Sequence, residues 1–296
     1  MLKKFQKLLH IASLVENIKI DNKITIREEF LNYCAFNSQI SGITEQKYCN
    51  QEIIISLTTY NKRLHQVYLS IESLMQQSMK ANKIVLWLSS DYQNKLLPPV
   101  LALQQKRGLE IYYCDDIKSY KKLIPSLKKY PDSVIITVDD DVYYNHNFIE
   151  NFIFSYLKSP NYIYFNRGFT IQLKNNIFAP YIKWKNITHQ EVSPLNFATG
   201  VGGILYPPRC FNDEVFNEKI FMDICQYADD VWFKAMSLYN GIQSKKSVSV
   251  SPVGDDFLIN KSVQDIGLSK INNEKNMNDL QIKKVFDNYN LYSLLK

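Results

Sequence analysis

The sequence predicts an α/β fold in which helices cover both faces of a largely parallel sheet. Between residues 52 and 141, four short runs rich in Val, Ile and Leu alternate with three amphipathic helical patterns. This alternation is typical of βαβ units, and near-continuous apolar runs are typical of strands buried on both faces. A hydrophobic content of 46% over 296 residues is sufficient for such a core. We expect strands over residues 52–60, 83–90, 109–115 and 133–141, and helices over 64–78, 97–106 and 119–130.

The pattern after residue 141 is less regular, but it continues the same domain. In order, we expect a helix over 147–159, a strand or hairpin over 162–173, a mixed segment over 175–184, a glycine-rich turn into a short strand over 197–208, a helix over 224–241 and a last strand over 247–256. Gly241 is placed to end its helix, because glycine is favoured just beyond a helix C-terminus. We therefore predict a single domain over 51–254, an N-terminal helical extension over 1–50 and a peripheral tail over 255–296.

Net charge indicates the class of partner, and cysteine content indicates the expected location. The formal net charge of +6 is mild, and the lysines are scattered rather than gathered in one block. Such a distribution favours anionic small molecules or an anionic membrane surface, and we expect no nucleic-acid partner. The five cysteines are widely spaced without a C-x-x-C pair, so we expect neither a disulfide framework nor a zinc site. A reducing cytoplasm is the expected location.

The first fifteen residues have helical spacing of apolar side chains with three lysines among them. One interpretation is a helix packed on the domain. The other is an amphipathic helix that lies on the anionic inner leaflet of the membrane. The segment lacks a long apolar region and a small-residue cleavage site, so it is not predicted to be a signal peptide. We therefore expect a cytoplasmic protein, with peripheral contact with the inner membrane as the open alternative.

Three consecutive aspartates, Asp139, Asp140 and Asp141, follow the fourth expected strand. Ligands of such sheets bind beyond the carboxyl ends of the strands, where the first strand also ends at residues 58–60. Crowded carboxylates are costly unless a cation balances them, and Mg²⁺ or Mn²⁺ takes oxygen ligands. In an extended segment residues i and i+2 face the same way, so Asp139 and Asp141 are the predicted metal ligands and Asp140 is expected to face a ribose or a backbone amide. The alternative is a turn and helix-cap cluster, since Asp favours both.

A second acidic element, Asp229 and Asp230, precedes the apolar residues 231–233 of an expected helix. A helix N-terminus stabilises carboxylates through its dipole, which alone could explain the pair. The functional interpretation is a general base that takes a proton from an attacking hydroxyl. The presence of the aspartate triplet elsewhere in the chain favours the functional interpretation of this pair.

The segment GVGGILYPP contributes Gly200, Gly202 and Gly203. Glycine lets the backbone approach a ligand closely, but the spacing is that of neither a phosphate-binding loop nor a dinucleotide fold, and a tight turn explains it equally well. Basic residues that could meet a diphosphate are Arg63, Lys121, Lys122 and Arg167.

In this order, ISLTTYNKR, VDDDV, GVGGILYPP and ADDVWFK resemble the GT-A-fold glycosyltransferases of the bacterial surface-polysaccharide kind, which make capsule and lipopolysaccharide. The resemblance spans roughly residues 52–252. It implies a Rossmann-like, mostly parallel sheet and a hexosyltransferase activity. It also implies a nucleotide-sugar donor, with a UDP-sugar as the expected one, a glycan or lipid-linked acceptor, and Mn²⁺ or Mg²⁺ as cofactor.

The resemblance also assigns roles to residues. Asp139 and Asp141 match the DxD positions, with Asp141 as the more direct metal ligand, and Asp230, beside Asp229, matches the catalytic base of inverting members. The positions that match the nucleotide-sugar site are Thr58, Thr59, Tyr60, Arg63, Lys122, Asp139, Asp140, Gly202 and Gly203. The chain departs from the family because no histidine follows His189 as a further ligand, so the resemblance implies a metal held by the triplet, the diphosphate and water.

The implied reaction is a direct displacement in which Asp230 deprotonates the acceptor hydroxyl, although retention stays open. Two alternatives differ in class. A haloacid-dehalogenase-like phosphohydrolase also places D-x-D after an apolar strand, but normally on the first core strand. A non-catalytic sugar-binding domain would need no base.

Overall fold

The predicted α/β class is confirmed by the computed structural model, which describes residues 2–174, 177–248, 257–260 and 277–296, with side chains from residue 17 onward. A seven-stranded sheet in the order β13-β6-β12-β4-β1-β2-β3 forms the centre. Neighbouring strands are parallel except at β12, which runs antiparallel to both β4 and β6. The strands of this sheet are β1 (Ile53–Thr58), β2 (Lys83–Ser89), β3 (Leu109–Cys114), β4 (Val134–Thr137), β6 (Ile163–Phe165), β12 (Ile204–Tyr206) and β13 (Ser244–Lys246).

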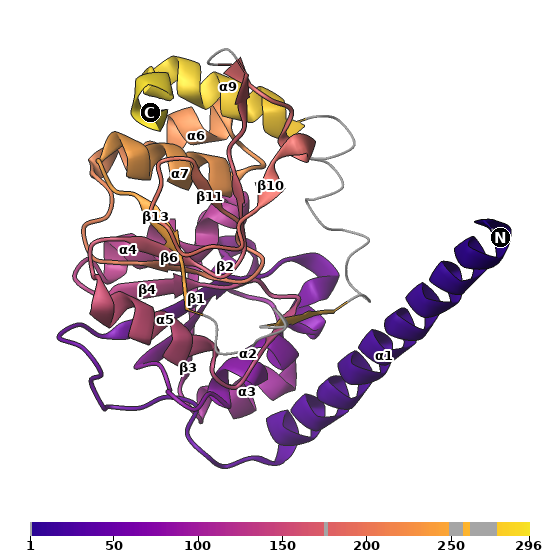
Figure 1. Ribbon diagram of the computed structural model, residues 1–296. Helices are drawn as coiled ribbons and strands as arrows, with labels where there is room; N and C mark the ends of the chain where they lie inside the picture. Colours follow the sequence, from indigo (N-terminus) through magenta and orange to yellow (C-terminus); the bar gives the residue numbers. More distant parts are fainter. Residues whose placement is uncertain (1, 175–176, 249–256, 261–276) are drawn as a thin grey trace.

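Helices flank the sheet, and small sheets complete the fold (Figure 1). The helices are α1 (Leu2–Asn37), α2 (Val67–Met75), α3 (Pro99–Gln105), α4 (Ile124–Lys129), α5 (Phe148–Lys158), α6 (Glu218–Ile224), α7 (Asp229–Tyr239) and α9 (Met277–Tyr289). The minor strands are β5 (Val142–Tyr144), β7 (Gly168–Thr170), β8 (Leu173–Lys174), β9 (Ile177–Phe178), β10 (Lys185–Asn186), β11 (Asn196–Ala198) and β14 (Phe257–Ile259).

The alternation of side chains along the strands builds two cores. In β1, Ile53 and Ile55 belong to the core under α2, α3 and α5, whereas Ile54 belongs to the core under α4, α6, α7 and α9. Successive side chains of β1 point to opposite faces of the sheet. Because both faces are covered, every residue of this strand up to Leu57 is buried. The first four predicted strands correspond to β1, β2, β3 and β4, which lie side by side in this sheet in the order β4-β1-β2-β3.

Three expectations about local structure need correction. Strand β4 ends at Thr137 and the aspartate triplet lies in a turn, so the i, i+2 alternation of an extended strand does not apply to it. The predicted helix over 224–241 is present as α7 (Asp229–Tyr239) but begins later than expected: α6 ends at Ile224, and the Tyr227 amide donates to the Gln281 side chain (2.9 Å) instead of continuing a helix. The segment 162–173, expected to be a strand or a hairpin, contains two strands of different sheets: β6 joins the central sheet, and β7 pairs with β10 and β11.

Other boundaries lie close to expectation. Gly241 follows α7 with φ +73°, as a glycine beyond a helix C-terminus should. The last predicted strand falls mostly on residues 249–256, outside the described residues, and β13 is the edge strand of the main sheet beside β6.

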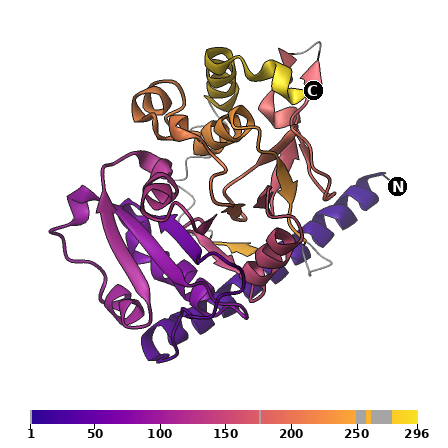
Figure 2. The same ribbon diagram turned by 90° about the vertical axis from the view of Figure 1, so that its left-hand side faces the viewer.

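The two ends of the chain pack differently. Helix α1 contacts α2 and α3 near its C-terminal end, and its other end extends away from the body (Figures 1 and 2). Helix α9 lies in the segment that we expected to be peripheral, yet Ile282, Val285 and Phe286 are buried in the core beside α7. The domain boundaries themselves remain a prediction. Among the described residues, no helix is long and apolar enough to cross a membrane.

Candidate functional site

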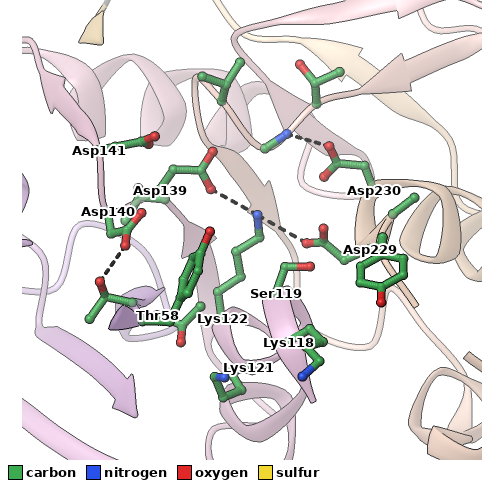
Figure 3. Close-up of a pocket in the computed structure, with 18 of the residues that line it drawn as sticks. Thr58, Lys118, Ser119, Lys121, Lys122, Asp139, Asp140, Asp141, Asp229 and Asp230 are labelled. Atoms are coloured by element: carbon green, nitrogen blue, oxygen red, sulfur yellow. Dashed lines mark hydrogen bonds and ion pairs between the residues drawn. The ribbon is translucent and has the colours of Figure 1, made fainter. Parts of the chain in front are cut away.

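A cavity of about 730 Å³ opens at the carboxyl ends of β1, β2 and β4. It extends from the loop after β1 to the first turn of α7, so segments far apart in the sequence line it together (Figure 3). The structure places ten of the predicted site residues in its lining: Thr58, Thr59, Tyr60, Arg63, Lys122, Asp139, Asp140, Asp141, Asp229 and Asp230. The strand-end rule therefore located the cavity correctly.

The turn after β4 directs two of its aspartates to one arginine. Arg63 contacts Asp140 through Nη1 at 2.8 Å and Asp141 through Nη2 at 3.0 Å, and all three side chains are buried. Thr59 donates a hydrogen bond to the other oxygen of Asp140 (2.5 Å). Burial raises the pKa of Asp140, and Arg63 and Thr59 offset only part of this effect. Asp140 and Asp141 thus share a cation, which differs from the expected division with Asp139 and Asp141 on one side.

Lys122 joins the triplet to the acidic pair. Its Nζ lies 3.0 Å from Asp139 and 3.2 Å from Asp229, and Figure 3 shows the amine between these two carboxylates. Burial lowers the pKa of Lys122, but the surrounding carboxylates, Asp139 foremost, raise it well above its usual value overall. The lysine therefore stays charged and balances two acidic elements that lie 90 residues apart in the sequence.

The backbone that carries Lys122 is fixed to the central strand. The hydroxyl of Ser56, in β1, donates to the Lys122 carbonyl (2.6 Å) and contacts the Ser126 hydroxyl at 2.7 Å. The indole N–H of Trp87 donates to the same Ser126 hydroxyl (2.7 Å). Because these polar groups are buried and bonded to one another, they hold the short helix over Lys118–Lys122 in one position.

Asp230 faces the cavity from the start of α7. The Gly200 amide donates to its Oδ2 (3.0 Å), and its Oδ1 has no hydrogen-bond partner among the described residues. Burial and the neighbouring Asp229 raise the pKa of Asp230 to about 7, against the lowering effects of Lys122 and the Gly200 amide. A carboxylate with one unengaged oxygen and a pKa near neutrality has the properties of a general base.

The glycine segment acts in two ways. Gly200 lines the cavity, and a Cβ there would lie 2.7 Å from Nζ of Lys122, so a side chain would disturb the ion network. Gly202 and Gly203, the two predicted to contact the donor, do not line it. Gly203 has φ +83°, and a Cβ there would lie 2.6 Å from the ring of Phe148, so its role is to let the turn pack closely.

The donor set of the site suits a hard cation. Four carboxylates contact two cations, Lys122 and Arg63, and Asp230 lines the cavity beside them, so negative charge is in excess in this part of the cavity before any phosphate binds. In the part of the chain that the structure describes, no three His, Cys, Asp or Glu side chains are arranged to hold an ion together. Mg²⁺ and similar ions commonly use one or two carboxylates and complete their shell with water and substrate phosphate. Asp139, with a quarter of its side chain exposed, is more accessible than Asp141 at 9%.

Residues that sequence reasoning missed line both ends of the cavity. On the sheet side they follow β2 and β3: Asp91, Tyr92, Asp116, Lys118 and Ser119. The strand-end rule could have identified them, since β2 and β3 are parallel neighbours of β1. On the α7 side, Phe169, Tyr181, Phe197 and Tyr227 add aromatic surface, and Arg167, considered from the sequence as a diphosphate contact, lies beside them. No local pattern marks these positions, because they depend on how β7, β11 and α9 come together.

Two histidines, His146 and His189, lie outside the site. The ring of His146 contacts the Gln76 carbonyl at 2.6 Å on the surface, and His189 is exposed. Neither lines the cavity. All five cysteines are free thiols.

Comparisons with known proteins give distant likenesses only. No family model matches the sequence, and no curated protein matches it. Among solved structures, residues 1–349 of S. aureus TarS in complex with UDP are similar with a TM-score of 0.43 at 15% identity, over 67% of this chain and 58% of that one. The mannosyltransferase PcManGT from Pyrobaculum calidifontis, in complex with GDP-Man and Mn²⁺, is similar with a TM-score of 0.43 at 11% identity, over 81% of this chain and 69% of that one. The chain thus spans less than two thirds of the TarS fragment, and likenesses this distant carry no argument about function.

Proposed function

We propose that this chain is a glycosyltransferase that moves a hexosyl group from a nucleoside-diphosphate sugar to a hydroxyl of a glycan or lipid-linked acceptor. The observation that carries the proposal is that Asp229 and Asp230 line one cavity with the aspartate triplet, and that Lys122 lies between Asp139 and Asp229. Such a cavity has an anchoring end for a charged leaving group and a basic end for an attacking hydroxyl. A UDP-sugar is the donor that we expect.

The donor end is supported by its charges and hydrogen-bonding groups. Lys122 and Arg63 are buried cations that can stabilise the charge that develops on a leaving diphosphate. Asp139 and Asp141 would hold Mn²⁺ or Mg²⁺, with Asp139 as the more accessible of the two. The ion, when bound, would supply positive charge to the diphosphate oxygens. Thr59 keeps Asp140 oriented, so Asp140 supports the turn as well as facing the donor.

Asp230 is the proposed base. Its free Oδ1 would accept the proton of the acceptor hydroxyl as that oxygen attacks the anomeric carbon. Asp229 is bound to Lys122, so it acts on Asp230 by charge rather than as the proton acceptor. A base opposite the leaving group predicts inversion.

The acceptor end is supported by aromatic surface. The ring of Tyr181 packs against Phe169 at 5.6 Å and Phe197 at 5.9 Å between centroids, and all three line the cavity near α7. Aromatic faces suit the apolar faces of sugar rings. Helix α9 holds this wall in place, since Asp279 accepts the Tyr181 amide (2.7 Å).

A donor screen tests the proposal. UDP-, GDP-, CMP- and dTDP-sugars are incubated with the protein, with and without Mn²⁺, and binding and hydrolysis are measured. We expect one donor class to bind and to be slowly hydrolysed, with loss of both on chelation. No binding of any donor, with no effect of chelator, would contradict the proposal.

Two controls separate the rival classes. A phosphohydrolase would release inorganic phosphate from simple phosphate esters without an acceptor. A sugar-binding domain would bind its ligand equally well and show no turnover in either the natural chain or its Asp230→Asn variant. The cytoplasmic location and the contact of the N-terminal helix with a membrane remain predictions.

A further inference from the structure

Arg167 is the one cation in the lining of the cavity that contacts no carboxylate among the described residues. The other basic side chains of the lining are all paired: Arg63 with Asp140 and Asp141, Lys122 with Asp139 and Asp229, and Lys118 and Lys121 with Asp116. The Arg167 side chain is exposed, and its Cζ lies 5.3 Å from the centre of the Phe169 ring. Its positive charge therefore faces the cavity without an internal counter-ion.

The backbone of Arg167 is fixed beside the proposed base. Its carbonyl accepts hydrogen bonds from the Thr199 amide (3.0 Å) and the Thr199 hydroxyl (3.2 Å). The next residue, Gly200, donates its amide to Asp230 (3.0 Å). The glycine turn also packs on the arginine, since a Cβ at Gly202 would lie 3.2 Å from the Arg167 Cβ. Arg167 and Asp230 are thus attached to adjacent residues of one segment.

Tyr181 lies close to both charges. Its ring contacts Phe169, the ring on which Arg167 is stacked, at 5.6 Å between centroids. Burial raises the pKa of the Tyr181 hydroxyl, the negative charge of Asp230 raises it further, and the positive charge of Arg167 lowers it. A sugar hydroxyl that meets Asp230 would therefore lie beside Tyr181, with Arg167 nearby.

We propose that the acceptor carries an anionic group, a phosphate ester or a carboxylate, near its attacking hydroxyl, and that Arg167 binds this group. The inference rests on the proposed function, because it names the class of acceptor for the same cavity. A guanidinium binds phosphate and carboxylate oxygens through paired N–H donors. The charges of the cavity agree with this assignment. The donor end has an excess of carboxylates and suits a cation, whereas the acceptor end presents an unneutralised cation and suits an anion.

The diphosphate of the donor is the other anion that Arg167 could meet. Two buried cations, Arg63 and Lys122, already contact the aspartate triplet at the donor end. Arg167 instead stacks on the aromatic wall formed by Phe169 and Tyr181. Its position therefore favours the acceptor, and the experiments have to distinguish the two anions.

The first experiment follows the Arg167 side chain by NMR in the full-length chain labelled with ¹⁵N-arginine. The Arg167 Nε–H signal is identified by its loss in Arg167→Gln. Glucose, glucose 6-phosphate and glucuronate are titrated with and without UDP and Mg²⁺, which fill the donor end. We expect the anionic sugars to shift the signal saturably and about tenfold more tightly than glucose, in both conditions. A response to one anion alone would identify the group as phosphate or as carboxylate. Equal weak responses to all three sugars, or a shift that UDP abolishes, would overturn the proposal.

Acceptor kinetics supply the second readout. Methyl glycosides of glucose, galactose and mannose are offered as neutral sugars, as 6-phosphates and as uronates. The natural chain is compared with Arg167→Gln and with the matched control Arg209→Gln, whose arginine is 85% exposed and does not line the cavity. We expect Arg167→Gln to raise KM about tenfold for the anionic acceptors, with KM for the neutral acceptors and for the donor within twofold. Arg209→Gln should change none of these values, and both variants should melt at the temperature of the natural chain.

The outcomes separate this inference from the proposed function. A tenfold rise in donor KM in Arg167→Gln would assign the arginine to the diphosphate and overturn the inference, as would equal KM values for neutral and anionic acceptors in the natural chain. If no sugar of the panel is used as acceptor, the NMR titration decides. If no donor is turned over, the proposed function fails, and the titration without UDP still decides whether Arg167 binds the anionic sugars.

Discussion

Replacing Lys122 with methionine should destabilise the protein strongly. The amine lies within 3.2 Å of both Asp139 and Asp229, and the lysine side chain is 9% exposed. Methionine has similar length and no charge, so the substitution removes the cation and leaves the packing almost unchanged. What remains is two carboxylates that have lost their common counter-ion beside a third, Asp230, whose pKa is already raised.

The expected magnitude follows from burial. Breaking a buried ion pair by removing one partner costs about 3–5 kcal/mol, because the remaining charge stays desolvated. For a domain of this size each kcal/mol lowers the melting temperature by roughly 2–4 °C. We therefore expect Lys122→Met to melt roughly 6–20 °C below the natural chain at pH 8. The loss should be smaller at pH 5, since protonation of the carboxylates then removes the uncompensated charge.

Lys121→Met is the matched control. Lys121 is the adjacent residue and is as buried as Lys122, but its partner Asp116 is 43% exposed. Water can hydrate that carboxylate once the lysine is gone, so the cost should be about 1 kcal/mol or less. Thermal unfolding of the three proteins at pH 8 and pH 5, followed by circular dichroism, measures the differences. Because the pKa of Lys122 is raised, the lysine stays charged over this range, and the pH dependence reports the carboxylates. Equal losses for the two variants, or a loss that does not shrink at pH 5, would refute the reasoning.

Three further predictions concern single residues. Asp230→Asn should lower kcat about 10²–10⁴-fold with a much smaller change in donor affinity, whereas Asp132→Asn on the surface should change neither; equal losses of turnover and binding would contradict the role as base. Since the pKa of Asp230 is about 7, kcat/KM should fall about tenfold per pH unit below that value, and a profile that is flat to pH 5 would remove Asp230 from the mechanism. Gly203→Ala should cost about 2–4 kcal/mol of unfolding free energy, from its positive φ and the contact with Phe148. Gly241→Ala has a similar φ but meets no atom of the described residues within 4 Å, so it should cost only about 1–2 kcal/mol; equal costs in urea unfolding would show that the contact is unimportant.

The sheet could be predicted from the sequence because its strands are buried on both faces. Residues 53–57 are all buried, and the continuous apolar run that this requires is visible without any tertiary information. The ends of elements were harder to predict. Strand β4 ends at Thr137 because the following residues turn toward Arg63 and Lys122, and these partners come from other parts of the chain.

The cavity could be predicted, but the pairing of its charges could not. The strand-end rule places the triplet and the loop after β1 at one rim, whatever their side chains contact. That Arg63 binds Asp140 and Asp141 depends on the geometry of a short helix 77 residues earlier in the chain. The burial of Lys234 could not be predicted either. Within the sequence WFKAM a lysine looks like an ordinary helix residue, yet it is 6% exposed.

The charges of the site make the donor end and the basic end dependent on each other. Lys122 balances Asp139 and Asp229 together, and Asp139 itself contributes to the raised pKa of Asp230. Any cation or diphosphate that binds beside Asp139 therefore changes the electrostatic potential at Asp230. By linkage, the ionisation of Asp230 must in turn change the affinity for that ligand, because the same interaction free energy between the two sites enters both the protonation and the binding equilibrium. It follows that the pH profile of kcat/KM, which reports the free protein, and that of kcat, which reports the donor complex, should differ in their acidic midpoints. The structural reason is that one buried lysine serves both ends of the cavity.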